Sequence, residues 1–303
     1  MVGTRCAIIG LAGRPNVGKS TLVNALVGEK VAIVSHKPQT TRRSIRGVLS
    51  GDGWQLIFTD LPGVQRPLDQ LTQRMQRTVE RELADADAVL FIVDAAAGIG
   101  PGDRFIAHAL SETQSKQSTP VLVAVNKVDR LKVEATAAAL IEAERLVEKG
   151  LEIAEILPIS AHEGRGLEPL VQCLAALAPE GPMLFPIDQR TDLPEALRVA
   201  ELIREQVLER TRAELPHAVE VVVEEVEQKT SLTVVRALLW AESPSQRAIL
   251  IGRAGRMIRE IGTAARRELE RHFGSQVHLD LRVRVEKDWR KRAQMLDRLG
   301  LKG

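Results

Sequence analysis

The octapeptide Gly-Arg-Pro-Asn-Val-Gly-Lys-Ser at residues 13–20 constrains the fold of this chain more than any other feature. It matches the pattern G-x-x-x-x-G-K-[ST] and directly follows a short apolar run at residues 6–11. Glycines in such a loop let backbone N–H groups close around phosphate oxygens, and the following helix adds its positive dipole end. Lys19 would contact the β- and γ-phosphates, and the Ser20 hydroxyl would bind Mg²⁺. The predicted nucleotide-binding residues here are Gly13, Arg14, Pro15, Asn16, Val17, Gly18, Lys19, Ser20 and Thr21.

Short apolar runs bounded by Gly, Asp or Asn predict the strands of the first domain. They lie at residues 6–11, 55–59, 88–93, 121–125 and 153–159, with helical patterns between them. Strands spaced by helices indicate a mainly parallel sheet with helices on both faces and ligands at the carboxyl ends of its strands. Pro179, Gly181, Pro182 and Pro186 then interrupt regular structure. We therefore expect an α/β domain over residues 1–180 and a linker over residues 181–190.

Three further motifs each follow a predicted strand. In Asp60-Leu61-Pro62-Gly63, Asp60 would hold Mg²⁺ through water and the Gly63 N–H would bond the γ-phosphate. In Asn126-Lys127-Val128-Asp129, the Asp129 carboxylate can accept from both N1–H and the amine of guanine. Adenine has neither donor, so ATP would leave this carboxylate unpaired at a cost of a few kcal/mol. At Ser160-Ala161 a backbone N–H would reach guanine O6, so the motifs together predict GTP as the ligand.

The segment between Ser20 and Asp60 contains a loop at residues 35–42 that would order over the γ-phosphate and Mg²⁺. Thr41 is our choice for the Mg²⁺-linked threonine, with Thr40 as the alternative. Lys19, Thr41, Asp60 and Gly63 are therefore the predicted catalytic residues. Val64 occupies the place of a water-orienting glutamine and cannot replace it, and Gln65 is an unsupported stand-in. Asn16 suggests a K⁺ ion that supplies positive charge beside the phosphates.

The total charge of the chain hides a basic module. There are 42 Lys and Arg against 40 Asp and Glu, but the net charge is −1 over residues 1–180, −5 over 181–246 and +8 over 247–303. Such asymmetry suggests a polyanionic partner. Aromatic residues make up only 3% of the chain, which argues against RNA recognition by broad stacking platforms.

Residues 191–303 predict a smaller α+β domain. A capping box at residues 192–195 starts a helix to about residue 215, and strands follow at 219–226 and 232–241. Gly-Arg-Ala-Gly at residues 252–255 opens an amphipathic helix, which precedes an alternating strand at 277–285 and a charged helix near 288–299. The G-x-x-G pattern alone is weak evidence, since it also occurs at residues 10–13 and 300–303.

The setting of residues 252–255 distinguishes this loop from the other two. It follows the apolar residues 248–251, carries arginines and begins a long helix. KH domains use such a loop to clamp backbone nucleotides, with the bases along an adjacent apolar groove. The predicted RNA-binding residues, with the two isoleucines lining that groove, are Ile251, Gly252, Arg253, Ala254, Gly255, Arg256, Ile258 and Arg259. Two interpretations are open for Arg266, Arg267, Arg271 and residues 290–292. They are auxiliary RNA contacts or merely solvated surface positions, and we prefer the second.

Over essentially its whole length, this combination of motifs resembles the Era family of bacterial ribosome-biogenesis GTPases. The resemblance implies an α/β P-loop GTPase domain followed by an α+β KH (type II) domain over residues 191–303. It also implies GTP or GDP with Mg²⁺ as ligands, binding near the 3′ end of small-subunit (16S) ribosomal RNA, and assistance to maturation of the 30S precursor. Loose association with the inner membrane surface is implied as well. We expect a monomer with no DNA partner.

The expected compartment is the cytoplasm. Cys6 and Cys173 form no metal-binding pattern, no apolar run reaches the length of a membrane helix, and the first residues lack a signal peptide. One functional hypothesis is a GTPase whose switch loops control RNA binding. A second is an RNA-binding placeholder that holds GTP but hardly hydrolyses it, consistent with Val64. A membrane-surface or tRNA-modifying GTPase is disfavoured, because only twelve residues precede Gly13.

Overall fold

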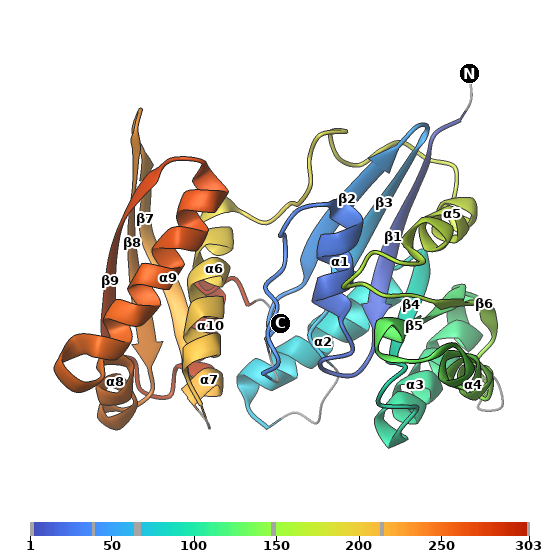
Figure 1. Ribbon diagram of the computed structural model, residues 1–303, viewed down its shortest axis with the longest axis horizontal. Helices are drawn as coiled ribbons and strands as arrows, with labels where there is room; N and C mark the ends of the chain where they lie inside the picture. Colours follow the sequence, from blue (N-terminus) through green and yellow to red (C-terminus); the bar gives the residue numbers. More distant parts are fainter. Residues whose placement is uncertain (1–2, 38–39, 64–67, 147–149, 213–214, 302–303) are drawn as a thin grey trace.

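The computed structural model describes residues 3–37, 40–63, 68–146, 150–212 and 215–301. The described chain forms two lobes, each with its own sheet and core (Figure 1). The first lobe has a six-stranded sheet in the order β2-β3-β1-β4-β5-β6, in which only β2 runs antiparallel to its neighbour. Its strands are β1 Arg5–Ala12, β2 Ile45–Gly51, β3 Trp54–Asp60, β4 Ala88–Asp94, β5 Val121–Asn126 and β6 Ile153–Pro158.

The five predicted strands of this lobe are confirmed, but the sequence analysis missed β2. This strand contains Gly47, and a Cβ at that position would lie 2.6 Å from Val23 Cγ1. Gly47 therefore lets the neighbouring helix approach the strand, although glycine in a strand interior weakens a sequence-based strand prediction. The helices of this lobe are α1 Lys19–Val27, α2 Gln70–Ala84, α3 Pro101–Gln117, α4 Val133–Glu144 and α5 Leu167–Leu177, with a 3₁₀ turn η1 at Val128–Arg130.

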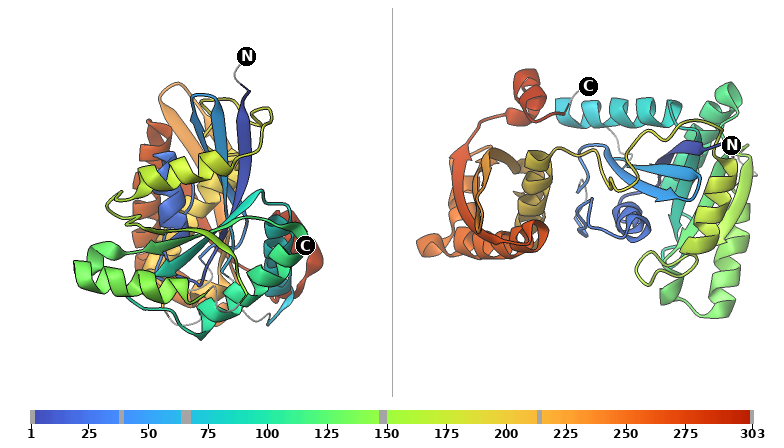
Figure 2. Two further views of the ribbon diagram at one scale, coloured as in Figure 1. Left: turned by 90° about the vertical axis from the view of Figure 1, so that its right-hand side faces the viewer. Right: turned by 90° about the horizontal axis from the view of Figure 1, so that it is seen from above.

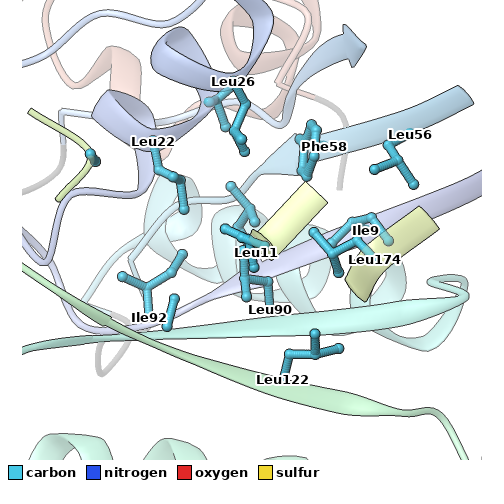
Figure 3. Packing of buried hydrophobic residues seen from close by; sticks show 14 of the residues in the cluster. Ile9, Leu11, Leu22, Leu26, Leu56, Phe58, Leu90, Ile92, Leu122 and Leu174 are labelled. Atoms are coloured by element: carbon cyan, nitrogen blue, oxygen red, sulfur yellow. The ribbon is translucent and has the colours of Figure 1, made fainter. Parts of the chain in front are cut away.

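Helices cover both faces of the sheet, as predicted. On one face, α1 and α5 pack Leu22, Leu26 and Leu174 against β1, β3 and β4 (Figure 3). On the other face, α3 and α4 contribute Ile106 and Ala143 to a second core. Burial on both faces explains why the central strands are continuously apolar. The phosphate loop therefore leaves β1 at the centre of a rigid, two-sided core.

The segment between α5 and α6 contains no helix or extended strand and lies against the first lobe. Cys6 N–H donates to the Pro179 carbonyl at 3.1 Å. The Gln55 side chain, fully buried, accepts from Leu184 N–H at 2.9 Å and donates to the Phe185 carbonyl at 2.9 Å. The predicted linker at residues 181–190 is thus held against the sheet of the first lobe for part of its length.

The second lobe has a three-stranded sheet in the order β7-β8-β9, antiparallel between β7 and β8 and parallel between β8 and β9. Helices α6 and α9 pack on one face through a core that includes Val199, Ile203, Ile261 and Leu269. The elements are α6 Glu195–Arg210, α7 Leu215–Ala218, β7 Glu220–Gln228, β8 Leu232–Ala241, α8 Pro244–Ile251, η3 Arg253–Gly255, α9 Arg256–Phe273, β9 Gln276–Val285, η4 Trp289–Lys291 and α10 Ala293–Arg298.

The structure corrects the predicted ends of two helices in this lobe. Helix α6 begins after Pro194 without a side-chain cap, so the capping box predicted at residues 192–195 is wrong. It ends at Arg210 rather than near residue 215, because Thr211 turns into extended backbone and returns its hydroxyl to the Val207 carbonyl. The helix predicted near residues 288–299 is split into η4 and α10.

Helix α2 and the residue before it join the first lobe to the carboxy-terminal segment of the second (Figure 2). Arg74 donates to Asp297 at 2.6 Å, and Arg290 Nε donates to Asp69 at 2.8 Å. Arg290 therefore has an acidic partner in the first lobe, which favours a structural role for it over the auxiliary RNA contact considered above. No helix within the described ranges is long and apolar enough to span a membrane.

Candidate nucleotide site and RNA-binding surface

The phosphate loop has the backbone geometry that its glycines predict. Gly13 and Gly18 have φ values of 151° and 103°. A Cβ at Gly13 would lie 2.6 Å from the Ile92 carbonyl oxygen, and one at Gly18 would lie 2.4 Å from Asn126 Nδ2. Lys19 is buried and donates to the Gly13 and Arg14 carbonyls at 3.0 and 3.1 Å. Desolvation by burial lowers the pKa of Lys19, and the nearby Asp60 carboxylate offsets part of this effect.

Two residues of the loop serve the scaffold through their side chains. The Arg14 guanidinium turns away from the loop and pairs with Asp103 on α3 at 2.8 Å. Val17 is buried in the core of the lobe. A contact of either residue with the nucleotide would therefore be made by its backbone.

An oxygen cluster lies at the start of α1. Ser20 Oγ donates to Asp60 Oδ2 at 2.6 Å, and Thr41 Oγ1 lies 3.4 Å from the same oxygen and 3.3 Å from Ser20 Oγ. The other Asp60 oxygen, Oδ1, is buried and has no hydrogen-bond partner among the described residues. Burial raises the pKa of Asp60, which a nearby cation would offset. Hard oxygen donors of this kind fit Mg²⁺.

The loop predicted at residues 35–42, called the switch loop below, contains two threonines that differ in their surroundings. The Thr40 hydroxyl donates to the Lys37 carbonyl at 2.6 Å and takes no part in the oxygen cluster. Only Thr41 joins Ser20 and Asp60. Gly63 lies against the phosphate loop, where a Cβ would meet Pro15 Cγ at 2.9 Å. Residues 38–39 and the predicted positions Val64 and Gln65 lie outside the described residues.

The base-recognition motif is tied to the phosphate loop. Asn126 Nδ2 donates to the Val17 carbonyl at 2.8 Å, and Asn126 Oδ1 accepts from Ala161 N–H at 3.0 Å. Lys127 Nζ donates to the Asn16 carbonyl at 2.6 Å. A guanine O6 would have to share the Ala161 N–H with Asn126.

Asp129 is held for recognition of a base edge. Its Oδ1 accepts from the Ser160 hydroxyl at 2.7 Å, and this hydrogen bond lowers the pKa of Asp129. The carboxylate is therefore ionised and oriented at neutral pH. Ser160 itself is fully buried, so its role is to position Asp129 rather than to touch a ligand.

An open cavity of about 460 Å³ connects these elements. The predicted residues that line it come from the phosphate loop, the switch loop and the base motif, among them Lys19, Thr41, Gly63 and Asp129. Sequence reasoning missed three lining residues that flank motifs without belonging to them: Val34, Arg130 and His162. Adjacency to the motifs was the only signal available for them.

The residues that follow Thr41 enter the second lobe. Arg42 is 2% exposed and donates to Glu220 and to the Val219 carbonyl, both at 2.8 Å. Its guanidinium also lies 5.6 Å from the centre of the Trp289 ring. Arg43 donates to Glu201 at 2.6 Å. A buried ionic network thus starts at the residue beside the Mg²⁺-type oxygen cluster.

The same network holds the switch loop from the other side. Arg204 on α6 donates to the Thr40 carbonyl and pairs with Glu201. The residues on both sides of Thr41 are therefore held by the second lobe, Thr40 through its backbone carbonyl and Arg42 through its side chain. Sequence motifs did not reveal this network, because its members lie 158 to 178 residues apart.

The G-x-x-G loop forms a sharp turn between α8 and α9. Gly252 and Gly255 have φ values of 73° and 74°, and Ala254 is also left-handed with φ 51°. A Cβ at Gly252 would lie 2.7 Å from Met257 Cβ, whereas a Cβ at Gly255 would meet nothing within 4 Å. Gly252 is thus required by the turn itself, while Gly255 leaves open space at its surface.

The predicted RNA-binding side chains surround this turn. Arg253, Ala254, Arg256 and Arg259 are exposed, and Ile251 and Ile258 are half-buried. Arg256 pairs with Glu260 one helical turn later at 2.7 Å. Ile249 on α8 is 55% exposed and was not among the predicted groove residues.

Comparisons with known proteins cover both lobes. A family model described as a 50S ribosome-binding GTPase matches residues 8–127, and a KH domain model matches residues 214–290. GTPase Era of Mycobacterium avium is 44% identical over 303 residues, which is 99% of this chain and 100% of that protein. This chain belongs to the GTPase Era family. It is accordingly a GTP-hydrolysing protein with a carboxy-terminal KH domain.

Further relatives agree with this membership. GTPase Era of Carboxydothermus hydrogenoformans is 43% identical over 291 residues, covering 95% of each chain. A crystal structure of Era with MgGDPNP and nucleotides 1506–1542 of 16S ribosomal RNA matches with a TM-score of 0.92 and 34% identity, covering 99% of this chain and 100% of that one. A single-residue variant of Aquifex aeolicus Era bound to GDP.AlF4⁻ also matches with a TM-score of 0.92, at 35% identity over 99% of this chain and 100% of that chain.

Proposed function

We propose that this GTPase binds small-subunit (16S) ribosomal RNA and that its nucleotide state controls RNA binding through the switch loop. The observation that carries the proposal is the position of Thr41. Its hydroxyl lies in the oxygen cluster, and the next residue, Arg42, is buried in the KH lobe. A change at the phosphates would therefore act on Thr41, and the residue next to it is bonded to the KH lobe.

The nucleotide would be held by three groups of residues. The phosphate loop and Lys19 bind the phosphates, and Gly63 N–H contacts the γ-phosphate. Asp129 accepts from the guanine edge while Ser160 orients it. Asn126, Lys127 and Ala161 join the base side of the site to the phosphate side.

The metal site would be formed by Ser20, Thr41 and Asp60. The unpaired buried oxygen of Asp60 and the proximity of the two hydroxyls support this donor set. Mg²⁺ bound there supplies positive charge to the β- and γ-phosphate oxygens. We choose Thr41 over Thr40, because Thr40 directs its hydroxyl to the Lys37 carbonyl.

Asn16 would bind a K⁺ ion beside the phosphates. Its Nδ2 donates to the His36 carbonyl at 3.0 Å, so its amide oxygen is the end that a cation would contact. A monovalent cation there would replace the charge of an arginine finger. We expect slow GTP hydrolysis that is faster in K⁺ than in Na⁺ at equal ionic strength. Equal rates in the two salts would contradict the K⁺ site and leave the Mg²⁺ site untouched.

The RNA would bind the KH lobe at the 252–255 turn. Arg253, Arg256 and Arg259 would contact phosphates, while Ile251 and Ile258 line the groove for bases. The 16S RNA bound to the similar Era structure supports a small-subunit partner. The description of the family model, which mentions the 50S subunit, concerns residues 8–127 and not the KH lobe.

Gly255→Asp tests the RNA site with little risk to the fold. A Cβ at this position meets open space, and Asp tolerates a left-handed backbone better than most residues. The new carboxylate should abolish binding of an oligonucleotide from the 3′ end of 16S RNA, while GTP binding stays intact. Gly274→Asp is the matched control, since that glycine is also left-handed with open space around it, at the opposite end of α9. Unchanged RNA affinity in Gly255→Asp would refute the clamp.

The wider role rests on family membership alone. We infer action on the 30S precursor, a cytoplasmic monomer that does not bind DNA, and loose contact with the inner membrane surface. The alternative is a placeholder that binds RNA and holds GTP but hardly hydrolyses it. The rate of single-turnover GTP hydrolysis, measured with and without RNA, distinguishes this placeholder from a regulatory GTPase. If the hydrolysis rate is negligible and neither RNA nor K⁺ raises it, the placeholder is favoured.

A further inference from the structure

The arginines of α9 fall into two groups that the sequence does not separate. Arg266 pairs with Glu270 at 3.8 Å, and Arg271 pairs with Glu268. Arg259 and Arg267 are exposed and have no ion pair within the described part of the chain. Their positive charge is therefore available to a ligand, whereas that of Arg266 and Arg271 is partly neutralised.

The unpaired arginines share a groove with α6. A groove of about 450 Å³ is lined by Arg210, Arg259, Glu260, Thr263, Ala264 and Arg267. Positions 259, 263 and 267 recur every four residues, so they lie along one face of the helix. Since α6 and α9 run in opposite directions, with Glu195 bonded to His272 at one end, Arg210 lies beside the amino-terminal half of α9 at the other end.

The charges around the groove are predominantly positive. Glu260 is the acidic residue among those that line it, and it is already bonded to Arg256 at 2.7 Å. Arg210 keeps contacts with Glu209 and Gln206 while it faces the groove. An anion would therefore be favoured at this surface.

We propose that this groove is a second phosphate-binding surface, which holds the sugar–phosphate backbone of the RNA strand flanking the nucleotides clamped at residues 252–255. The inference rests on the proposed RNA function. Arg259 lies one helical turn beyond Gly255, so the groove begins where the clamp ends. Arg259 and Arg267 are about 12 Å apart along the helix axis, which is enough for more than one phosphate. The surface has no aromatic side chain, so it would bind backbone rather than bases.

The test compares two pairs of charge-removing substitutions in the full-length protein. Arg210→Gln with Arg267→Gln removes charge from the groove and spares the clamp. Arg266→Gln with Arg271→Gln removes the same charge from paired arginines that do not line the groove. Glutamine keeps the side-chain stem and a high helix propensity. Each variant is titrated with a short RNA that spans only the clamp and with one extended by about ten nucleotides on each side.

The groove variant should bind the extended RNA roughly tenfold more weakly and the short RNA unchanged. For the extended RNA, the slope of log affinity against log salt concentration should become shallower by about 1.4. Each phosphate contact on a single strand contributes about 0.7 to this slope, and the variant loses two contacts. The control pair should match the wild type. Equal losses in both pairs would show an effect of overall charge and overturn the proposal. So would a selective loss of binding to anionic lipid vesicles with RNA affinity unchanged. If the wild type binds neither RNA, the proposed function itself fails.

Discussion

At the scale of single residues, the nucleotide site combines groups that touch a ligand with groups that orient them. Asp129 faces the cavity, while Ser160 is buried behind it and donates to its carboxylate. Thr41 belongs to the oxygen cluster, while its neighbour Thr40 is turned to the Lys37 carbonyl. Neighbouring positions of the same chemical type thus have different roles.

Asp129→Asn tests the choice of base. An amide cannot accept from both guanine donors, so affinity for GTP should fall by about 100-fold or more. Affinity for xanthosine triphosphate should rise, because its 2-oxo group can accept from the new amide. Competition with a fluorescent nucleotide measures both values. Ser160→Ala is the control for positioning and should cost about tenfold in GTP affinity without a change of base preference.

Thr41→Ala and Thr40→Ala separate the two threonines. Loss of the Thr41 hydroxyl should remove the Mg²⁺-dependent part of the affinity for a GTP analogue and leave GDP affinity nearly unchanged. Thr40→Ala loses one hydrogen bond to backbone, worth about 1 kcal/mol of stability, and should keep the Mg²⁺ dependence. Analogue titrations with and without Mg²⁺ provide the measurement. The reverse pattern would assign the metal contact to Thr40.

At the scale of elements, the turn between α8 and α9 depends on its two glycines for different reasons. Gly252 has φ 73° and ψ 173°, a region essentially limited to glycine, and its α-carbon faces Met257. Gly255 is left-handed with open space around it. Only the first glycine is therefore needed for the local fold.

Alanine at these two positions should have unequal effects on stability. Gly252→Ala combines backbone strain with a clash of its Cβ against Met257, and we expect a loss of about 3 kcal/mol. Gly255→Ala has only the left-handed penalty of about 1 kcal/mol. Urea denaturation of both variants measures the difference. Equal losses would mean that the close contact at Gly252 relaxes without cost.

Elements with strong local signals could be predicted from the sequence. The phosphate loop, the central strands and α9 each carry a motif or a clear period. Strand β2 could not be predicted, since Gly47 is selected by the approach of α1 and not by strand propensity. The end of α6 was predicted near residue 215, just before Pro216 in the sequence, whereas Thr211 ends the helix earlier.

The residues of the candidate site could likewise be predicted where they carry a local sequence signal. Motif residues were found because phosphate and base chemistry dictate their spacing, whereas the bonds of Arg42 and Arg43 to the KH lobe left no local pattern. The division of the α9 arginines also required the structure, since their ion pairs depend on the orientation of each side chain.

At the scale of the whole molecule, the two lobes are joined by buried charges. Glu220 is fully buried and faces three arginines, Arg42, Arg43 and Arg204. These arginines outweigh the effect of burial and lower the pKa of Glu220 to about 2. Breaking such a network leaves uncompensated buried charge, so the lobes should hold their arrangement strongly.

The network should make stability depend on acidity. Because the pKa of Glu220 is lower in the folded state than its ordinary value of 4.5, its contribution is complete above pH 4.5 and is lost as the pH falls toward 2. About 2 kcal/mol of this contribution should disappear between pH 6 and pH 3. Glu220→Gln should therefore be much less stable than the wild type at pH 6, and the gap should narrow at pH 3. A gap that is constant in urea denaturation at the two pH values would contradict this role.

The central claim is that nucleotide state and RNA binding are coupled through Thr41 and Arg42. The most direct measurement is the affinity for a 16S 3′-end oligonucleotide with a GTP analogue and with GDP, in the wild type and in Arg42→Ala, with folding checked by GDP binding. Coupling free energies of about 1–3 kcal/mol predict that the two wild-type affinities differ by about 5- to 150-fold, and that the difference nearly vanishes in Arg42→Ala. Equal RNA affinities of the wild type in the two nucleotide states would contradict the claim.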